Sequence, residues 1–169
     1  MKYLAAGLAL LIAAPALGAD LREQVSGYRA AHEAAIVGQL DELTRLRSVA
    51  ADPKGLAAAA AHLEDLLKAR GFETQSWSAA GSPPVVYGFL KSRGARRTAV
   101  FYAHYDGQPV TPSQWTSDPF APVMRDGPTG AQVDWKAAKP PFNPEWRFFG
   151  RAAADDKSSI TAGLGTQLP

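Results

Sequence analysis

The sequence predicts an α/β sandwich in which a mixed sheet is flanked by helices. Apolar residues recur at helical spacing from residue 20 to residue 67, and strand-like runs follow between residues 72 and 103. A further strand-like run at 146–151 ends at an acidic pair, after which another helix is expected. Strand ends of this kind carry the functional side chains in α/β proteins.

The chain begins with the three parts of a secretory signal. Lys2 is followed by an apolar stretch that reaches Ala14 and then by small residues up to Ala19. A membrane anchor is the weaker alternative, because a span needs about 20 apolar residues. We expect residues 1–19 to be removed and residues 20–169 to remain as one periplasmic or secreted unit.

Charge and cysteine content exclude several classes of function. The formal net charge of +2 gives no field that would favour nucleic acid, and we expect no membrane partner after leader removal. The absence of cysteine excludes disulfides, thiolate nucleophiles and cysteine-type zinc sites. Any metal must therefore be bound by histidine and carboxylates.

Two helices are expected at the start of the exported unit. Residues 20–47 carry apolar side chains at spacings of mostly three, four or seven, which predicts an amphipathic helix, and a break near Gly38 is the alternative. The second helix has Asp52 as N-cap, Pro53 in its first turn and Gly71 as its stop. Its buried stripe is expected to consist of Leu56, Leu63, Leu66 and Leu67.

Three strands are expected next, at residues 72–77, 85–90 and 99–103, and the third is expected to be the most buried. Residues 108–144 are rich in Pro, Gly, Asp and Trp with little periodicity, which predicts a long loop. Loops of that length are often functional. A strand over 146–151 then delivers Asp155 and Asp156 to the start of a helix.

The residues that carry chemistry lie at two of these strand ends. His104 and Asp106 point to the same side of an extended chain, so that one can bind a metal while the other orients it. A lone histidine is more often structural, and Asp155 with Asp156 could be an acidic first turn of a helix. Two strand ends with complementary ligand types predict half of a metal site. The other two histidines read as ordinary helix-surface residues: His32 and His62.

Three ordered motifs resemble one known family. Residues 101–109 (FYAHYDGQP), 114–127 (QWTSDPFAPVMRDG) and 150–157 (GRAAADDK) look like the zinc-dependent aminoacylase and carboxypeptidase G family of metallopeptidases, and the carnosinase-like dipeptidase branch is the most similar. The resemblance runs from about residue 40 to about residue 162. It implies a truncated, phosphorylase/hydrolase-like catalytic domain whose lid and dimerisation domain is absent, so that a homodimer is expected only for the full-length form.

The resemblance also implies roles for three residues. His104 would bind one zinc ion, Asp155 would bridge two zinc ions, and Asp106 would orient the imidazole. Cobalt or manganese are the alternative ions. The peptide bond between Asp155 and Asp156 tends to be cis in this family. We expect Arg151 and Lys157 only to balance the charge of these acids, and Trp115 and Phe120 to hold the long loop on the sheet.

The function that the resemblance implies is hydrolysis of an amide bond near a free carboxylate, in dipeptides or at C-terminal residues. The substrate would be a small peptide or an N-acyl amino acid. In the family the general base and the remaining ligands follow the Asp-Asp-Lys motif at a distance, so we expect the chain as given to be inactive. A deacylase of the same family, a non-catalytic periplasmic binding module and an unfolded product are the alternatives.

Overall fold

The structure is a computed structural model that describes residues 17–165, so the predicted signal peptide at 1–19 lies almost entirely outside the described residues. The α/β class expected from the sequence is confirmed. Within 17–165, no helix combines the length and apolar character that crossing a bilayer requires. The elements in chain order are α1(Leu17–Arg45), α2(Pro53–Lys68), β1(Glu73–Trp77), β2(Val85–Phe89), η1(Pro112–Gln114), β3(Val123–Asp126), β4(Gln132–Val133), β5(Trp146–Phe149), η2(Ala153–Lys157) and α3(Ser158–Gly165).

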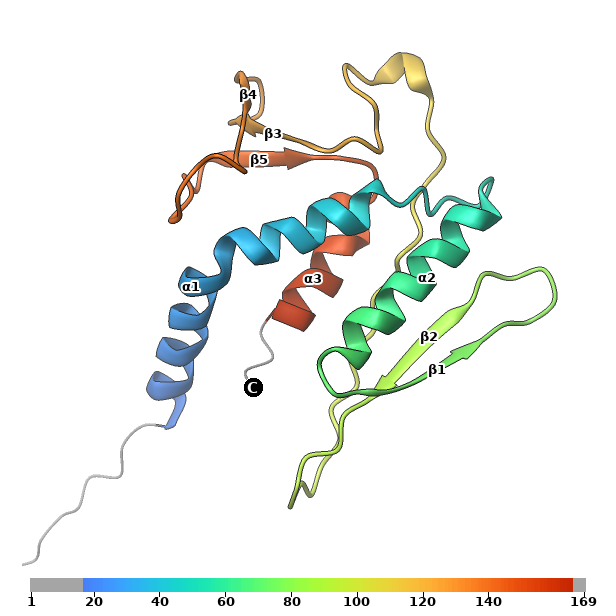
Figure 1. Ribbon diagram of the computed structural model, residues 1–169, viewed down its shortest axis with the longest axis vertical. Coiled ribbons are helices and arrows are strands. Elements are labelled where there is room, and N and C mark those ends of the chain that lie inside the picture. The colour runs from blue at the N-terminus through green and yellow to red at the C-terminus, as the bar shows by residue number, and fades with distance from the viewer. Residues whose placement is uncertain (1–16, 166–169) are drawn as a thin grey trace, which may run out of the picture.

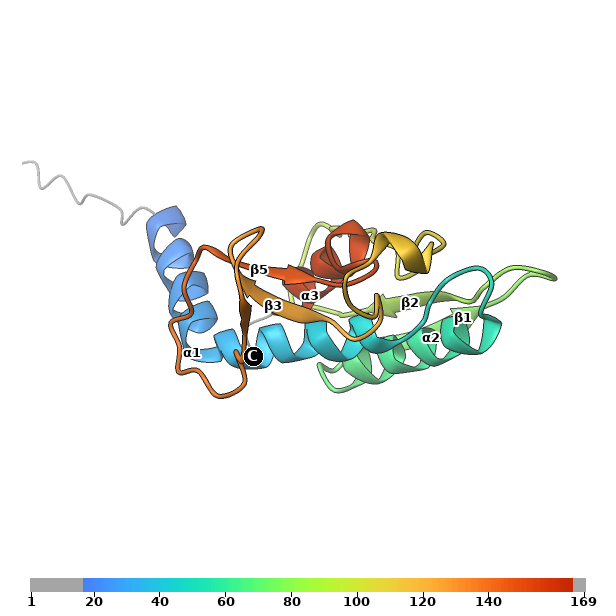
Figure 2. The same ribbon diagram turned by 90° about the horizontal axis from the view of Figure 1, so that it is seen from above.

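The strands form two small antiparallel sheets, where we expected one mixed sheet. β1 pairs with β2, and β3 lies between β4 and β5. α2 packs against β1 and β2, whereas the sheet of β3, β4 and β5 lies at the α1 end of the molecule (Figure 1). α3 packs against α1 and lies between the two groups, as Figure 2 shows from above. The short α3 and the turn η2 therefore occupy the middle of the fold.

The second helix follows the sequence prediction closely. The Asp52 carboxylate accepts a hydrogen bond from the Gly55 backbone N–H at 2.9 Å, and Pro53 opens the helix. Gly71 ends the segment with a positive φ of 81°, which glycine adopts at no steric cost. The buried side of the helix consists of Leu56, Ala59, Ala60 and Leu63, whereas Leu66 and Leu67, which we also expected to be buried, are half-buried.

The first helix agrees with its prediction at Gly38. α1 continues through this residue, although the helix changes direction part-way along its length (Figure 1). The Gly38 position faces the Trp135 ring, since a Cβ there would lie 3.9 Å from the ring. Gly38 therefore lies inside one continuous helix, and the alternative of a break at this residue does not occur.

The expectation of a third, most buried strand at 99–103 is wrong. Val100, Phe101 and Tyr102 are 87%, 90% and 87% exposed, and the segment has no strand assignment. A strand needs a neighbouring backbone for its hydrogen bonds, and within the described residues β2 pairs only with β1. The long loop expected at 108–144 is also partly wrong, because it contains β3 and β4.

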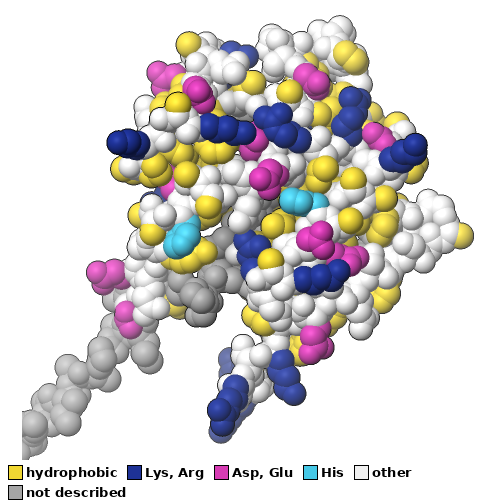
Figure 3. Space-filling model, in the orientation of Figure 1, with side chains coloured by type: hydrophobic (Ala, Val, Ile, Leu, Met, Phe, Trp, Pro, Cys, Tyr) yellow, Lys and Arg dark blue, Asp and Glu magenta, His cyan; other side chains and the backbone are white. Residues whose placement is uncertain are grey.

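Charged side chains of both signs are interspersed on the face drawn in Figure 3, apart from one basic loop below β1 and β2. That loop carries four exposed cations, which are Lys91, Arg93, Arg96 and Arg97. The most buried side chains of the described residues lie at the end of α1 and in the linker after it, on α2 and in η2: Leu43, Thr44, Ser48, Ala59 and Lys157.

Candidate metal centre

The backbone that follows His104 is fixed by the linker between α1 and α2. Ser48 Oγ donates to the Tyr105 carbonyl at 2.6 Å, and the Gly107 N–H donates to the Ser48 carbonyl at 2.8 Å. On the other side, the Tyr105 hydroxyl donates to the carbonyl of Pro84. His104 is thus held in an extended segment although no sheet flanks it.

Asp155 lies in an irregular turn between β5 and α3. Ala152 opens the turn in the left-handed conformation, with φ of 62°. Asp155 and Asp156 then leave helical geometry, with φ of −127° and −131°, before Ser158 starts α3. The peptide bond between the two aspartates is cis, as the resemblance implied.

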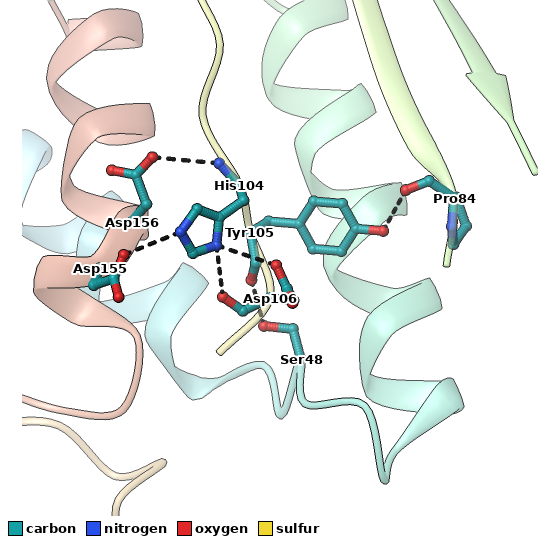
Figure 4. Close-up of polar contacts among 7 residues, drawn as sticks. All are labelled: Ser48, Pro84, His104, Tyr105, Asp106, Asp155 and Asp156. Carbon is teal, nitrogen blue, oxygen red and sulfur yellow. Dashed lines mark hydrogen bonds and ion pairs between the residues drawn. The ribbon is translucent and has the colours of Figure 1, made fainter. Parts of the chain in front are cut away.

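Two motifs whose residues His104 and Asp155 are 51 positions apart in sequence meet at this turn (Figure 4). The His104 Nε2 atom lies 3.0 Å from Asp155 Oδ1, and Nδ1 lies 3.1 Å from Asp106 Oδ1. The His104 backbone N–H also donates to Asp156 Oδ2 at 3.3 Å. The structure therefore brings together the imidazole and the three carboxylates that the sequence singled out.

The carboxylates change the protonation of the imidazole. Partial burial lowers the pKa of His104, but the hydrogen bonds with Asp155 and Asp106 outweigh burial and raise the pKa above its ordinary value of 6.5. A hydrogen bond from Ser159 lowers the pKa of the Asp156 carboxyl, and the His104 N–H lowers it further. The His104 side chain is 35% exposed and that of Asp155 is 80% exposed, so an ion can reach both groups from solvent.

The geometry fits two ligands of one metal ion. Zinc binds imidazole nitrogen at about 2.0–2.1 Å and carboxylate oxygen at about 2.0–2.2 Å in tetrahedral geometry, which places such a nitrogen and oxygen about 3.3 Å apart. The observed 3.0 Å between His104 Nε2 and Asp155 Oδ1 is close to that separation. Across residues 17–165, however, no group of three or more His, Cys, Asp or Glu side chains is arranged to hold a metal ion.

The chain is similar in sequence to desuccinylases and in fold to two dipeptidases. No family model matches the chain. Succinyl-diaminopimelate desuccinylase of Herminiimonas arsenicoxydans is 32% identical over 123 residues, which are 72% of this chain and 26% of that protein. The di-peptidase Dug1p of Saccharomyces cerevisiae has a TM-score of 0.66 at 18% identity, and human carnosine dipeptidase 1 has 0.59 at 23% identity. These alignments cover 85% and 89% of this chain, and 30% and 31% of the two dipeptidases.

The chain matches part of the catalytic domain of the metallopeptidase family that its motifs resemble. It spans about a quarter of the length of the curated relatives that it matches. The relatives are hydrolases, so the resemblance to metal-dependent hydrolases is confirmed. The two dipeptidases, below 25% identity, show the shared fold alone.

The burial of Lys157 differs from what the sequence predicted. We expected a solvated lysine that balances the neighbouring acids, but its side chain is fully buried. Burial lowers the pKa of the Lys157 ammonium to about 8. Its Nζ atom donates to the carbonyls of Leu43 and Leu46 at the end of α1, more than 100 residues away in sequence. No short-range pattern could have shown this contact.

The aromatic residues of the loop before β3 hold that loop in place. Phe120 is buried, and the Arg47 guanidinium lies 4.5 Å from its ring centre. Trp115 lies under the Arg151 guanidinium at 5.0 Å, so this arginine packs on a ring in the present structure. His32 is exposed on α1, whereas His62 on α2 is half-buried and less of a surface residue than we expected.

Proposed function

We propose that this chain is the N-terminal part of the catalytic domain of an exported dizinc metallopeptidase, which in full-length form hydrolyses amide bonds of dipeptides or of C-terminal residues. The observation that carries this proposal is the 3.0 Å approach of His104 Nε2 to Asp155 Oδ1. The position of both residues in motifs that resemble the family supports it. Its expected location, the periplasm or the exterior, rests on the leader at residues 1–19.

Each of the three predicted site residues would have a different role in binding zinc. Asp106 would accept a hydrogen bond from the Nδ1–H group of His104, which would leave the Nε2 lone pair for the ion and raise its basicity. Asp155 would supply the carboxylate that bridges two ions. Bound zinc lowers the pKa of a coordinated water and polarises the scissile carbonyl. Cobalt or manganese could take the same ligands.

A complete catalytic site would need residues beyond these three. A catalytic zinc ion takes about three protein ligands, and His104 with Asp155 supplies two positions. We therefore propose that this chain alone is inactive. The longer protein would provide the general base and the remaining ligands, and it would be a homodimer.

A deacylase of N-acyl amino acids is the second candidate. The desuccinylase relatives favour it, because the name of these enzymes describes removal of a succinyl group from an acylated amino acid. A non-catalytic periplasmic binding module that keeps the fold is the third alternative. The choice among them depends on chemistry that a substrate assay can measure.

The test compares the full-length gene product with this chain for zinc content and for hydrolysis of dipeptides and N-succinyl amino acids. We expect zinc and activity in the full-length protein, and loss of both in its His104→Ala variant. His32→Ala is the matched control, since it removes an exposed histidine of α1. A full-length protein without zinc, or a His104→Ala variant with normal zinc content, would refute the proposal.

A further inference from the structure

The most unusual charged group outside the proposed ligands is Lys157. Its side chain has no exposed surface, and its Nζ atom donates to the Leu43 carbonyl at 2.9 Å and the Leu46 carbonyl at 3.0 Å. α1 ends at Arg45, so both acceptors belong to the last turn of this helix or directly follow it. A lysine two residues after Asp155 is therefore bound to an element that lies far away in the sequence.

The contact has a clear electrostatic basis. The last carbonyls of a helix have no partner within the helix and carry a partial negative charge, which favours a cation there. A buried ammonium without partners would be strongly unfavourable, so Lys157 depends on these carbonyls. The carbonyls depend less on the lysine, because Leu43 O also accepts from the Leu46 N–H and Leu46 O from the Ser48 N–H.

Hydrogen bonds of the Lys157 backbone fix both ends of the irregular turn. Its backbone N–H donates to the Ala152 carbonyl at 3.1 Å, and Thr161 Oγ1 donates to its carbonyl at 3.0 Å. Between these ties, Asp155 and Asp156 have non-helical dihedral angles, so helical hydrogen bonding does not fix their position. The side chain of Lys157 supplies two hydrogen bonds between this turn and the end of α1.

We propose that Lys157 is a positioning residue, whose ammonium, held by the end of α1, places the Asp155 carboxylate against the His104 imidazole. The inference deepens the proposed function, since it concerns the same two side chains. It requires no bound metal, because the approach of Asp155 to His104 is present in the chain itself. If Lys157 only capped α1, the effect of its removal would be a loss of stability.

The experiment uses the metal-free chain and the ¹⁵N chemical shift of His104 Nε2, which reports the hydrogen bond to Asp155. Asp155→Ala gives the shift without that bond. We expect Lys157→Met to move the resonance at least half-way from the wild-type value to the Asp155→Ala value. Leu63→Ala, which removes a buried side chain of α2, is the control for destabilisation alone and should leave the resonance unchanged.

All spectra are recorded at one pH and at a temperature where circular dichroism shows each variant to be folded. Lys157→Gln, which can donate to one carbonyl, is the second variant if Lys157→Met does not fold, and an intermediate shift is expected. A folded Lys157 variant with the wild-type resonance would overturn the inference, as would an equal change in Leu63→Ala. Failure of zinc binding in the full-length protein would refute the proposed function but not this result.

Discussion

At the residue scale, both ring nitrogens of His104 face carboxylates, and each has a different task. Asp155 faces Nε2 on the side where an ion would bind, whereas Asp106 faces Nδ1 and would fix the tautomer in the proposed site. The backbone carbonyl of Asp106 lies 3.1 Å from the same Nδ1 atom. The backbone therefore orients the ring together with the Asp106 carboxylate. The two carboxylates should therefore differ in what their removal does.

Asp106→Ala should weaken zinc binding to the full-length protein about 10- to 100-fold without abolishing it. The carbonyl of Asp106 would still orient the ring, but the carboxylate would no longer raise the basicity of the imidazole. Isothermal titration calorimetry measures the change. Asp65→Ala, which removes an exposed carboxylate from α2, serves as the control. Equal zinc affinities for Asp106→Ala and the wild type would contradict the role that the resemblance implies.

Gly107 and Ala152 approach each other where the two site segments meet. A Cβ atom at 107 would lie 2.8 Å from the Ala152 Cβ, and Ala152 itself has a positive φ of 62°. We expect Gly107→Ala to lower the free energy of unfolding by about 1–3 kcal/mol through overpacking. Adding Ala152→Gly should recover part of that loss, because it removes the clashing methyl group and glycine adopts positive φ readily.

Urea unfolding of both single variants and the double variant gives the coupling energy, which we expect to be about 1 kcal/mol. Gly27→Ala is the control, since nothing lies within 4 Å of the added Cβ and alanine is the better helix former. Additive effects of the two substitutions would show that the close contact is relaxed elsewhere.

At the element scale, Asp41 ties α1 to the segment after β4. Its carboxylate accepts from Arg45 Nε at 3.0 Å and from Lys136 Nζ at 3.1 Å, and its side chain is 4% exposed. Burial raises the pKa of Asp41, but the hydrogen bonds from Arg45 and Lys136 outweigh burial and lower the pKa below 3.8. The charged carboxylate is therefore favoured more in the folded chain than in the unfolded chain.

This stabilisation should be complete above the unfolded pKa of 3.8 and should disappear as pH falls through the lower pKa of the folded chain. Asp41→Asn should reduce the free energy of unfolding by about 1–3 kcal/mol near neutral pH. The difference from the wild type should shrink below about pH 4. Urea unfolding across that range measures it, with Asp65→Asn as a control. A difference that persists unchanged at pH 2 would argue against the ion pair.

Elements with local signals were predictable from the sequence. The N-cap Asp52, the first-turn Pro53 and the stop Gly71 lie within a few residues of the helix they define, and all three appear as expected. The approach of His104 to Asp155 was expected from two predicted strand ends and from motif resemblance, although residues 99–103 form no strand. The anchoring of Lys157 and the hydrogen bond of Ser48 to Tyr105 join residues 114 and 57 positions apart, and no local pattern encodes such contacts.

At the scale of the whole molecule, the run from Val100 to Tyr102 shows the limit of reasoning from one segment. Its apolar residues have the composition of a buried strand, yet burial depends on which other elements are present to cover it. The chain spans about a quarter of the length of its curated relatives, and within the described residues no strand pairs with this run. Exposed apolar segments with strand-like composition are in general prone to association.

Substitution of Phe101 and Phe120 tests this exposure directly, because Phe101 is 90% exposed whereas Phe120 is only 7% exposed. Phe101→Ser should change the free energy of unfolding of this chain by no more than about 0.5 kcal/mol. It should also reduce the binding of the dye ANS and the tendency to aggregate, since it removes exposed apolar surface. Phe120→Ala should destabilise by about 3–5 kcal/mol, because it empties a buried position under Arg47. Urea unfolding at several chain concentrations measures both. Comparable losses from Phe101→Ser and Phe120→Ala would show that residue 101 is covered in solution.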